Sequence, residues 1–74
     1  MNAKLEDRLE WTVIFVYEFA KAYNLDMKEA INYLCQYDGI GFIDRNYEYV
    51  HIQSFKCMVN EISVYCALNG GSLQ

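Results

Sequence analysis

The chain has 74 residues, of which 54% are hydrophobic and 16% aromatic, so it can form one core near the lower size limit of an independent domain. Its net charge is −4 and its six lysines and arginines are scattered, which argues against nucleic-acid binding, because that binding draws on clustered cations. No apolar run approaches the roughly 20 residues that span a bilayer, and the acidic N-terminus is unlike a signal peptide. We therefore expect one cytoplasmic domain over residues 1–74, with no membrane association.

The first predicted element is a long amphipathic helix over residues 3–23. The run at residues 12–16 is rich in β-branched side chains and would suit a strand by itself, but helical spacing continues beyond it. Asn24 suits the C-terminal end of this helix, because asparagine tolerates the left-handed conformation found there. At about 100° per residue, the predicted buried stripe is Leu5, Leu9, Thr12, Val16, Phe19, Ala20 and Tyr23.

A second predicted helix, over residues 27–37, has the clearest start signal in the chain. Asp26 and Glu29 form a capping-box pair, in which each side chain can accept a hydrogen bond from the other residue's backbone N–H. Apolar residues then recur at i, i+3, i+4 and i+7, which indicates one buried face. Gly39 and Gly41 are expected to end this helix in a turn. They do not make a phosphate loop, because the fuller glycine pattern and the lysine of such a loop are missing.

The remainder of the chain is expected to hold one short and one long helix. A short helical turn is predicted at residues 42–47 and irregular chain at residues 49–52, because a lone strand there would leave its backbone unpaired. Ser54 is a good N-cap for a helix over residues 55–68, after which the tail at about residues 70–74 should fray. The predicted fold is thus an all-α single-domain bundle of three long helices plus one short helix. Its predicted core is Leu9, Val13, Val16, Phe19, Ala20, Ile31, Leu34, Phe42, Phe55, Val59 and Ile62.

Neither catalysis nor cofactor binding is predicted. Cys35, Cys57 and Cys66 are an odd number without a C-x-x-C pair, so we expect reduced thiols and neither a disulfide framework nor a zinc site. His51 is the only histidine, and no nucleophile motif surrounds any cysteine. We interpret His51 as a turn residue bonded to a nearby backbone carbonyl.

Apolar residues outside the predicted stripes indicate a contact surface. Monomeric domains rarely expose contiguous apolar patches beyond a few hundred Å², so we expect another protein, or a second copy in a two-fold dimer, to cover these residues. The alternative is that residues 39–53 fold back over the part of this surface on the last helix and bury it. The candidate interface residues are Trp11, Ile14, Tyr17, Cys57, Val64 and Leu68.

Residues 26–47 allow an alternative function. They could form a helix-turn-helix with residues 42–47 as the recognition helix, and Arg45 would be the only cation of that helix. A small DNA-binding regulator is therefore the alternative to a protein-binding module.

The stretch NYEYVHIQ at residues 46–53 is the tightest part of a resemblance to a known family. Together with the spacing of residues before and after this stretch, it makes residues 11–68 resemble a bacterial family of short proteins of unknown function. Members of that family tend to have glycine at the position of Asp38. Members are often encoded beside a predicted toxin of ADP-ribosyltransferase type. The resemblance implies an accessory or antitoxin-like protein whose partner is a cognate toxin, and it supplies no active site. The motif residues that carry it are Asn46, Tyr47, Glu48, His51 and Gln53.

Overall fold

The computed structural model describes residues 3–71, with side chains from residue 7 onward. All regular structure in this part of the chain is α-helical, which confirms the all-α prediction. The three long helices lie at nearly the expected bounds, whereas two short helices are present where one was predicted. The five helices are α1 (Ala3–Tyr23), α2 (Met27–Gln36), α3 (Gly39–Arg45), α4 (Tyr47–Val50) and α5 (Phe55–Leu68).

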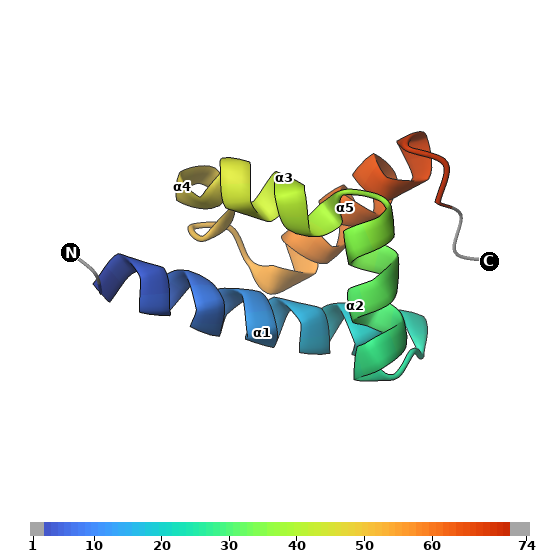
Figure 1. The fold of residues 1–74 in the computed structure, drawn as a ribbon, viewed down its shortest axis with the longest axis horizontal. Helices are drawn as coiled ribbons and strands as arrows, with labels where there is room; N and C mark the ends of the chain where they lie inside the picture. Colours follow the sequence, from blue (N-terminus) through green and yellow to red (C-terminus); the bar gives the residue numbers. More distant parts are fainter. Residues whose placement is uncertain (1–2, 72–74) are drawn as a thin grey trace.

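Helix α1 runs along the length of the molecule, and the other helices turn back over one of its sides (Figure 1). Helix α2 stands across the C-terminal end of α1, and α3 and α4 return toward its N-terminal half. Helix α5 contacts both α1 and α3, α2 does the same, and all five helices contribute buried residues to one core. None of the helices described between residues 3 and 71 is long and apolar enough to cross a bilayer.

The turn from α1 into α2 follows the local signals in the sequence. Asn24 has a φ of 58°, in the left-handed region that asparagine tolerates. The Asp26 carboxylate accepts a hydrogen bond from the Glu29 N–H at 2.7 Å, and the Glu29 carboxylate accepts one from the Asp26 N–H at 3.0 Å. The predicted capping box is confirmed, and it satisfies backbone donors that the first turn of α2 leaves unpaired.

The turn between α2 and α3 differs from the prediction. Asp38 makes the turn with a left-handed φ of 65°, and Gly39 and Gly41 belong to the first turn of α3. A Cβ atom on Gly39 would lie 2.7 Å from Leu34 Cδ2 and 3.0 Å from Cys66 Sγ. Gly39 therefore allows α3 to approach α2 and α5 closely. The left-handed φ of Asp38 is a conformation that glycine would adopt without strain.

Helices α3 and α4 replace the short helical turn and the irregular chain that the sequence predicted. Asn46 separates them, and its side-chain amide donates to the Phe42 carbonyl at 3.0 Å, at the end of α3. Ile43 and Val50 are almost completely buried. Burial of these two side chains favours helix over irregular chain, because the helical backbone satisfies its own hydrogen bonds beside an apolar core.

The N-terminal half of helix α1 presents a different face to the core from the one predicted, whereas Val16, Phe19 and Ala20 are buried as predicted. Leu9 and Val13 are 62% and 59% exposed, while Phe15 is completely buried. The Phe15 ring lies 5.4 Å from the ring of Trp11 and 5.9 Å from that of Phe19, so three aromatic residues at i, i+4 and i+8 form one continuous stack. Burying large rings removes more apolar area from water than burying leucine and valine does. The aromatic stack therefore determines how α1 is rotated.

The remaining core predictions are mostly confirmed. Ile31 is 42% exposed, contrary to prediction, because α2 turns Ala30 and Leu34 toward the core. Phe42 and Phe55 lie partly buried against the core. The predicted stripe residue Leu5 lies outside the described side chains. Six predicted core residues are buried, namely Val16, Phe19, Ala20, Leu34, Val59 and Ile62, and the core also contains Phe15, Ala30, Ile43, Val50, Met58 and Cys66.

Helix α5 begins as the sequence predicts, since the Ser54 hydroxyl accepts a hydrogen bond from the Cys57 N–H at 3.1 Å. Beyond α5, the Tyr33 hydroxyl donates to the Gly71 carbonyl at 2.7 Å. Part of the tail that was expected to fray is therefore held against α2. The remaining tail, residues 72–74, lies outside the described residues.

Candidate functional site

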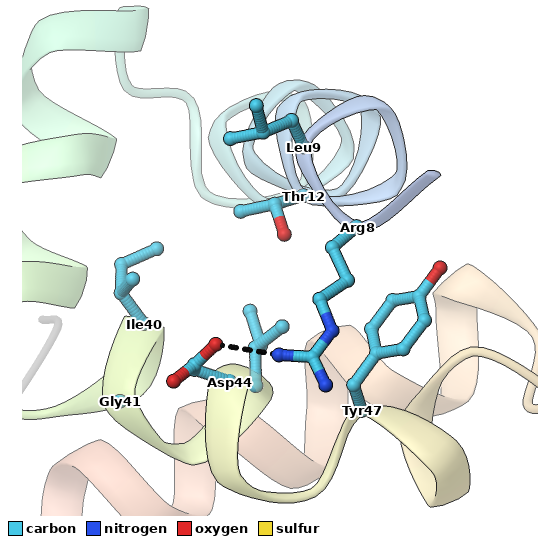
Figure 2. A pocket seen from close by; sticks show the side chains of 8 residues that line it. Arg8, Leu9, Thr12, Ile40, Gly41, Asp44 and Tyr47 are labelled. Carbon is cyan, nitrogen blue, oxygen red and sulfur yellow. Dashed lines mark hydrogen bonds and ion pairs between the residues drawn. The ribbon is translucent and has the colours of Figure 1, made fainter. Parts of the chain in front are cut away.

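A hollow of about 360 Å³ lies between α1 and α3 (Figure 2). Ile40 and Ile43 of α3 and Leu9 and Thr12 of α1 give it mostly apolar walls. Tyr47, the first residue of α4, adds an aromatic ring. We call this hollow the α1–α3 groove; it is lined by Arg8, Leu9, Thr12, Ile40, Gly41, Ile43, Asp44 and Tyr47.

Arg8 bridges the groove from α1 to α3. Its Nη1 donates to Asp44 Oδ1 at 2.9 Å, and its guanidinium carbon lies 5.2 Å from the centroid of the Tyr47 ring (Figure 2). Both side chains of the ion pair are substantially exposed. Such a pair contributes only about 0–1 kcal/mol, so it does little to hold α1 against α3.

A second hollow, of about 260 Å³, shares Arg8 and Tyr47 with the groove. Its remaining lining residues are Asp7, Glu48 and His51, and we call it the acidic hollow. The His51 ring stacks on Tyr47 with centroids 4.8 Å apart, and its Nδ1 lies 2.8 Å from the Tyr47 carbonyl oxygen. This contact confirms the interpretation of His51 as a residue bonded to a nearby backbone carbonyl.

The structure separates the family-like motif into residues at the site and residues that shape the backbone. Tyr47, Glu48 and His51 line the acidic hollow. Asn46 instead separates α3 from α4, and the Gln53 N–H donates to the carbonyl of Val50, the last residue of α4, at 3.1 Å. The motif therefore both ends α3 and forms one side of the site.

Sequence reasoning missed the residues that complete this site. Arg8 and Asp44 are separated by 36 positions in the chain, and no local pattern links them. Leu9 was assigned to the core, although it is 62% exposed beside the groove. Only the i, i+4 spacing of Tyr47 and His51 gave a local signal that these two rings share a helix face.

The candidate interface residues on α1 do not form one surface. Trp11 is partly buried, with its ring 5.4 Å from that of Phe15 and 5.2 Å from that of Phe55. Ile14 and Tyr17 are 43% and 52% exposed. Trp11 therefore packs within the fold, because stacking on two rings buries more of its surface than an outward position would.

The candidate interface residues on α5 lie in solvent. Cys57 is exposed, and Val64 and Leu68 are 52% and 81% exposed. The alternative in which residues 39–53 cover these side chains is wrong, because α3 contacts a different side of α5. There the rings of Phe42 and Tyr65 lie 4.7 Å apart.

A polar cluster along α3, from its N-cap Asp38 to Arg45 in its last turn, connects α3 to Tyr65 of α5. Arg45 Nη2 lies 2.7 Å from Asp38 Oδ2, and the Tyr65 hydroxyl donates to the same oxygen at 2.7 Å. The hydrogen bonds from Arg45 and Tyr65 lower the pKa of Asp38. Residues 42–47 do not form one recognition helix, since the break at Asn46 divides them between α3 and α4.

Comparison with known proteins gives one match. A sequence profile of the family described as protein of unknown function (DUF3791) matches residues 10–69. Searches of curated proteins and of solved structures gave no significant match. The match spans most of the chain, including α2 to α5 and the whole NYEYVHIQ stretch, although Arg8 and Leu9 of the groove lie before it. We therefore conclude that the chain belongs to the DUF3791 family of proteins of unknown function.

Proposed function

We propose that this protein is a protein–protein interaction module that serves another protein as an accessory or antitoxin-like partner. The observation that supports this proposal is the amount of apolar side chain left in solvent. Among the described residues, ten large hydrophobic side chains are exposed, and monomeric proteins rarely leave such groups uncovered in contiguous patches. They are Leu9, Val13, Ile14, Tyr17, Met27, Ile31, Tyr49, Ile52, Val64 and Leu68.

The α1–α3 groove supports the same proposal. It offers an apolar hollow with a weak ion pair at its edge, which a partner side chain can displace at little cost. In this proposal the chain performs no reaction itself, and it acts in the cytoplasm by covering a surface of its partner. The partner is a cognate toxin of the ADP-ribosyltransferase type that the family resemblance implies.

Co-expression with the product of the neighbouring reading frame tests the proposal. We expect the two proteins to co-purify, to elute as one complex in size-exclusion chromatography, and to reduce the activity of the neighbour in that complex. Failure to form any complex with a folded neighbour would contradict the antitoxin-like role.

The DNA-binding alternative is tested with the same purified protein. We expect fluorescence anisotropy of a labelled DNA duplex to stay unchanged at low salt, because the chain carries net charge −4. Binding that weakens steeply as salt is added would favour the DNA-binding regulator instead.

A further inference from the structure

We infer that the α1–α3 groove and the acidic hollow together bind a basic amphipathic helix of the partner protein. Aliphatic side chains of that helix enter the groove, and a lysine or arginine one turn away reaches the acidic hollow. This inference rests on the proposed function and adds the chemistry of the partner segment.

The shape of the groove fits side chains presented by a helix. Its volume of about 360 Å³ lies at the low end of the range of about 300–1,000 Å³ for ligand pockets, so it accepts a few aliphatic side chains. Leu9 and Val13 stand one turn apart on α1 and are 62% and 59% exposed. They extend the apolar lining of Ile40 and Ile43 along α1, which gives an apolar strip of the kind that amphipathic helices occupy.

The two hollows adjoin, because Arg8 and Tyr47 line both of them. Arg8, whose guanidinium lies 2.9 Å from Asp44, is one of the residues that the two hollows share. One helix lying along α1 can therefore place an apolar residue on one side of Arg8 and a charged residue on the other. Neighbouring residues at i and i+3 or i+4 have the matching separation.

The negative charge around the site favours a basic segment of the partner. Asp7 and Glu48 line the acidic hollow, and among the described side chains neither takes part in an ion pair. The charge of Arg8 is matched by Asp44, whose side chain is 70% exposed. The site therefore carries a negative excess within a chain of net charge −4. Complementary charge speeds association and disfavours wrong partners.

The same charge argues against a second copy of this chain as the occupant. A two-fold contact places the same patch of both copies face to face. Asp7, Asp44 and Glu48 would then meet their own counterparts, and like charges at an interface oppose association. Nucleic acid and anionic lipid are repelled for the same reason, which leaves a cationic segment of another protein.

Fluorescence anisotropy with defined peptides tests the inference. The probe is a fluorescein-labelled peptide of leucine and lysine, with leucine at i, i+3, i+4 and i+7. A peptide with glutamate in place of lysine tests charge, and a scrambled leucine–lysine peptide tests the apolar stripe. We expect only the leucine–lysine peptide with the apolar stripe to bind saturably.

Two pairs of matched variants locate the binding. Leu9→Gln and Glu48→Gln should each weaken binding of the leucine–lysine peptide by about tenfold. Leu68→Gln changes an exposed leucine on α5, and Glu10→Gln removes a charge from an exposed position of α1 that lines neither hollow. Both control variants should bind as the wild type does, and circular dichroism checks that all four variants are folded.

The outcomes separate this inference from the proposed function. The inference would be overturned if the leucine–lysine peptide did not bind, or if the glutamate peptide bound equally well. It would also be overturned if the test and control variants lost the same amount of affinity. If Leu9→Gln and Glu48→Gln still form the complex with the co-expressed neighbour, the interaction module stands and the groove is not its site. If these two variants, and not the controls, lose binding to the peptide and to the neighbour, the result supports both the inference and the proposed function.

Discussion

Gly39 shows how one residue controls the approach of two helices. A Cβ atom there would lie 2.7 Å from Leu34 Cδ2 and 3.0 Å from Cys66 Sγ. Gly39→Ala should therefore destabilise the fold by about 1–3 kcal/mol, although alanine in an open helix gains about 0.5–1 kcal/mol over glycine. Urea unfolding measures the change, with the exposed Asn60→Ala as the control. A Gly39→Ala variant as stable as the wild type would show that the neighbours move aside easily.

The three thiols differ in accessibility, and this difference can be measured. Cys66 is completely buried, while Cys35 and Cys57 are exposed. Burial, with a smaller contribution from the Asp38 charge, raises the pKa of Cys66 to about 11, so its reactive thiolate form is scarce. In the native protein near neutral pH, we expect a thiol reagent to modify Cys35 and Cys57 quickly and Cys66 only after denaturation. Rapid reaction of all three would contradict the burial of Cys66.

The same thiol makes stability depend on alkaline pH. The pKa of Cys66 rises from an ordinary value of 9.0 to about 11 in the fold, so between these values the folded chain keeps a proton that the unfolded chain loses. The stability associated with this proton is complete below pH 9.0 and is lost as the pH rises toward about 11. Denaturant unfolding should show a smaller loss over this interval in Cys66→Ala than in the wild type. Equal losses would mean that the thiol does not contribute.

At the scale of elements, two valines distinguish the faces of α1. Val16 is 3% exposed and Val13 is 59% exposed. Val16→Asp would bury an unpaired carboxylate at a cost of several kcal/mol, out of a total stability of about 5–15 kcal/mol. We expect circular dichroism to show an unfolded Val16→Asp and a folded Val13→Asp. A folded Val16→Asp or an unfolded Val13→Asp would contradict this orientation of α1.

The capping box of α2 has a measurable energy of its own. Asp26→Ala removes the acceptor that lies 2.7 Å from the Glu29 N–H, and loss of an N-cap costs about 0.5–2 kcal/mol. Urea unfolding should detect this loss in Asp26→Ala. Lys28→Ala, at an exposed position of the same helix, should stay within about 0.5 kcal/mol of the wild type. Equal stability of both variants would show that the cap is dispensable.

The starts of α2 and α5 were predictable because their signals are local. The pair Asp26 and Glu29 and the N-cap Ser54 act within one helical turn. The rotation of α1 was not predictable in this way, because apolar residues occur on nearly all sides of that helix. Whether Leu9 or Phe15 enters the core depends on rings such as Phe55, which arrive from other elements. Helix α4 was missed for the same reason, since Val50, its one buried residue, is buried in a core that residues of the other helices build.

At the scale of the whole molecule, the site was harder to predict than the fold. The motif around Tyr47 and His51 was found, but its partners Arg8 and Leu9 come from α1, distant in sequence, and Asp44 lies just before the motif, in α3. No local sequence pattern marks any of these residues as part of a site. They become a site only when α3 lies against α1.

Self-association is a prediction for the whole molecule as well. Cys57, Val64 and Leu68 are exposed on α5, and we propose that this strip pairs two copies around a two-fold axis. Sedimentation equilibrium should show a dimer of the wild type at micromolar concentration. Val64→Lys should sediment as a folded monomer, because Val64 is 52% exposed and lysine there needs no repacking. A wild type that stays monomeric throughout would show that only a different partner covers this strip.

The position of Trp11 gives the molecule an internal optical reporter. It is the only tryptophan, and its ring lies against Phe15 of α1, Phe55 of α5 and the edge of Tyr47 at the start of α4. Its emission therefore depends on the docking of two other helices onto α1. If α4 or α5 detaches while α1 remains helical, the emission should shift to the red before the helical signal is lost. Fluorescence can thus follow the assembly of this fold without any label.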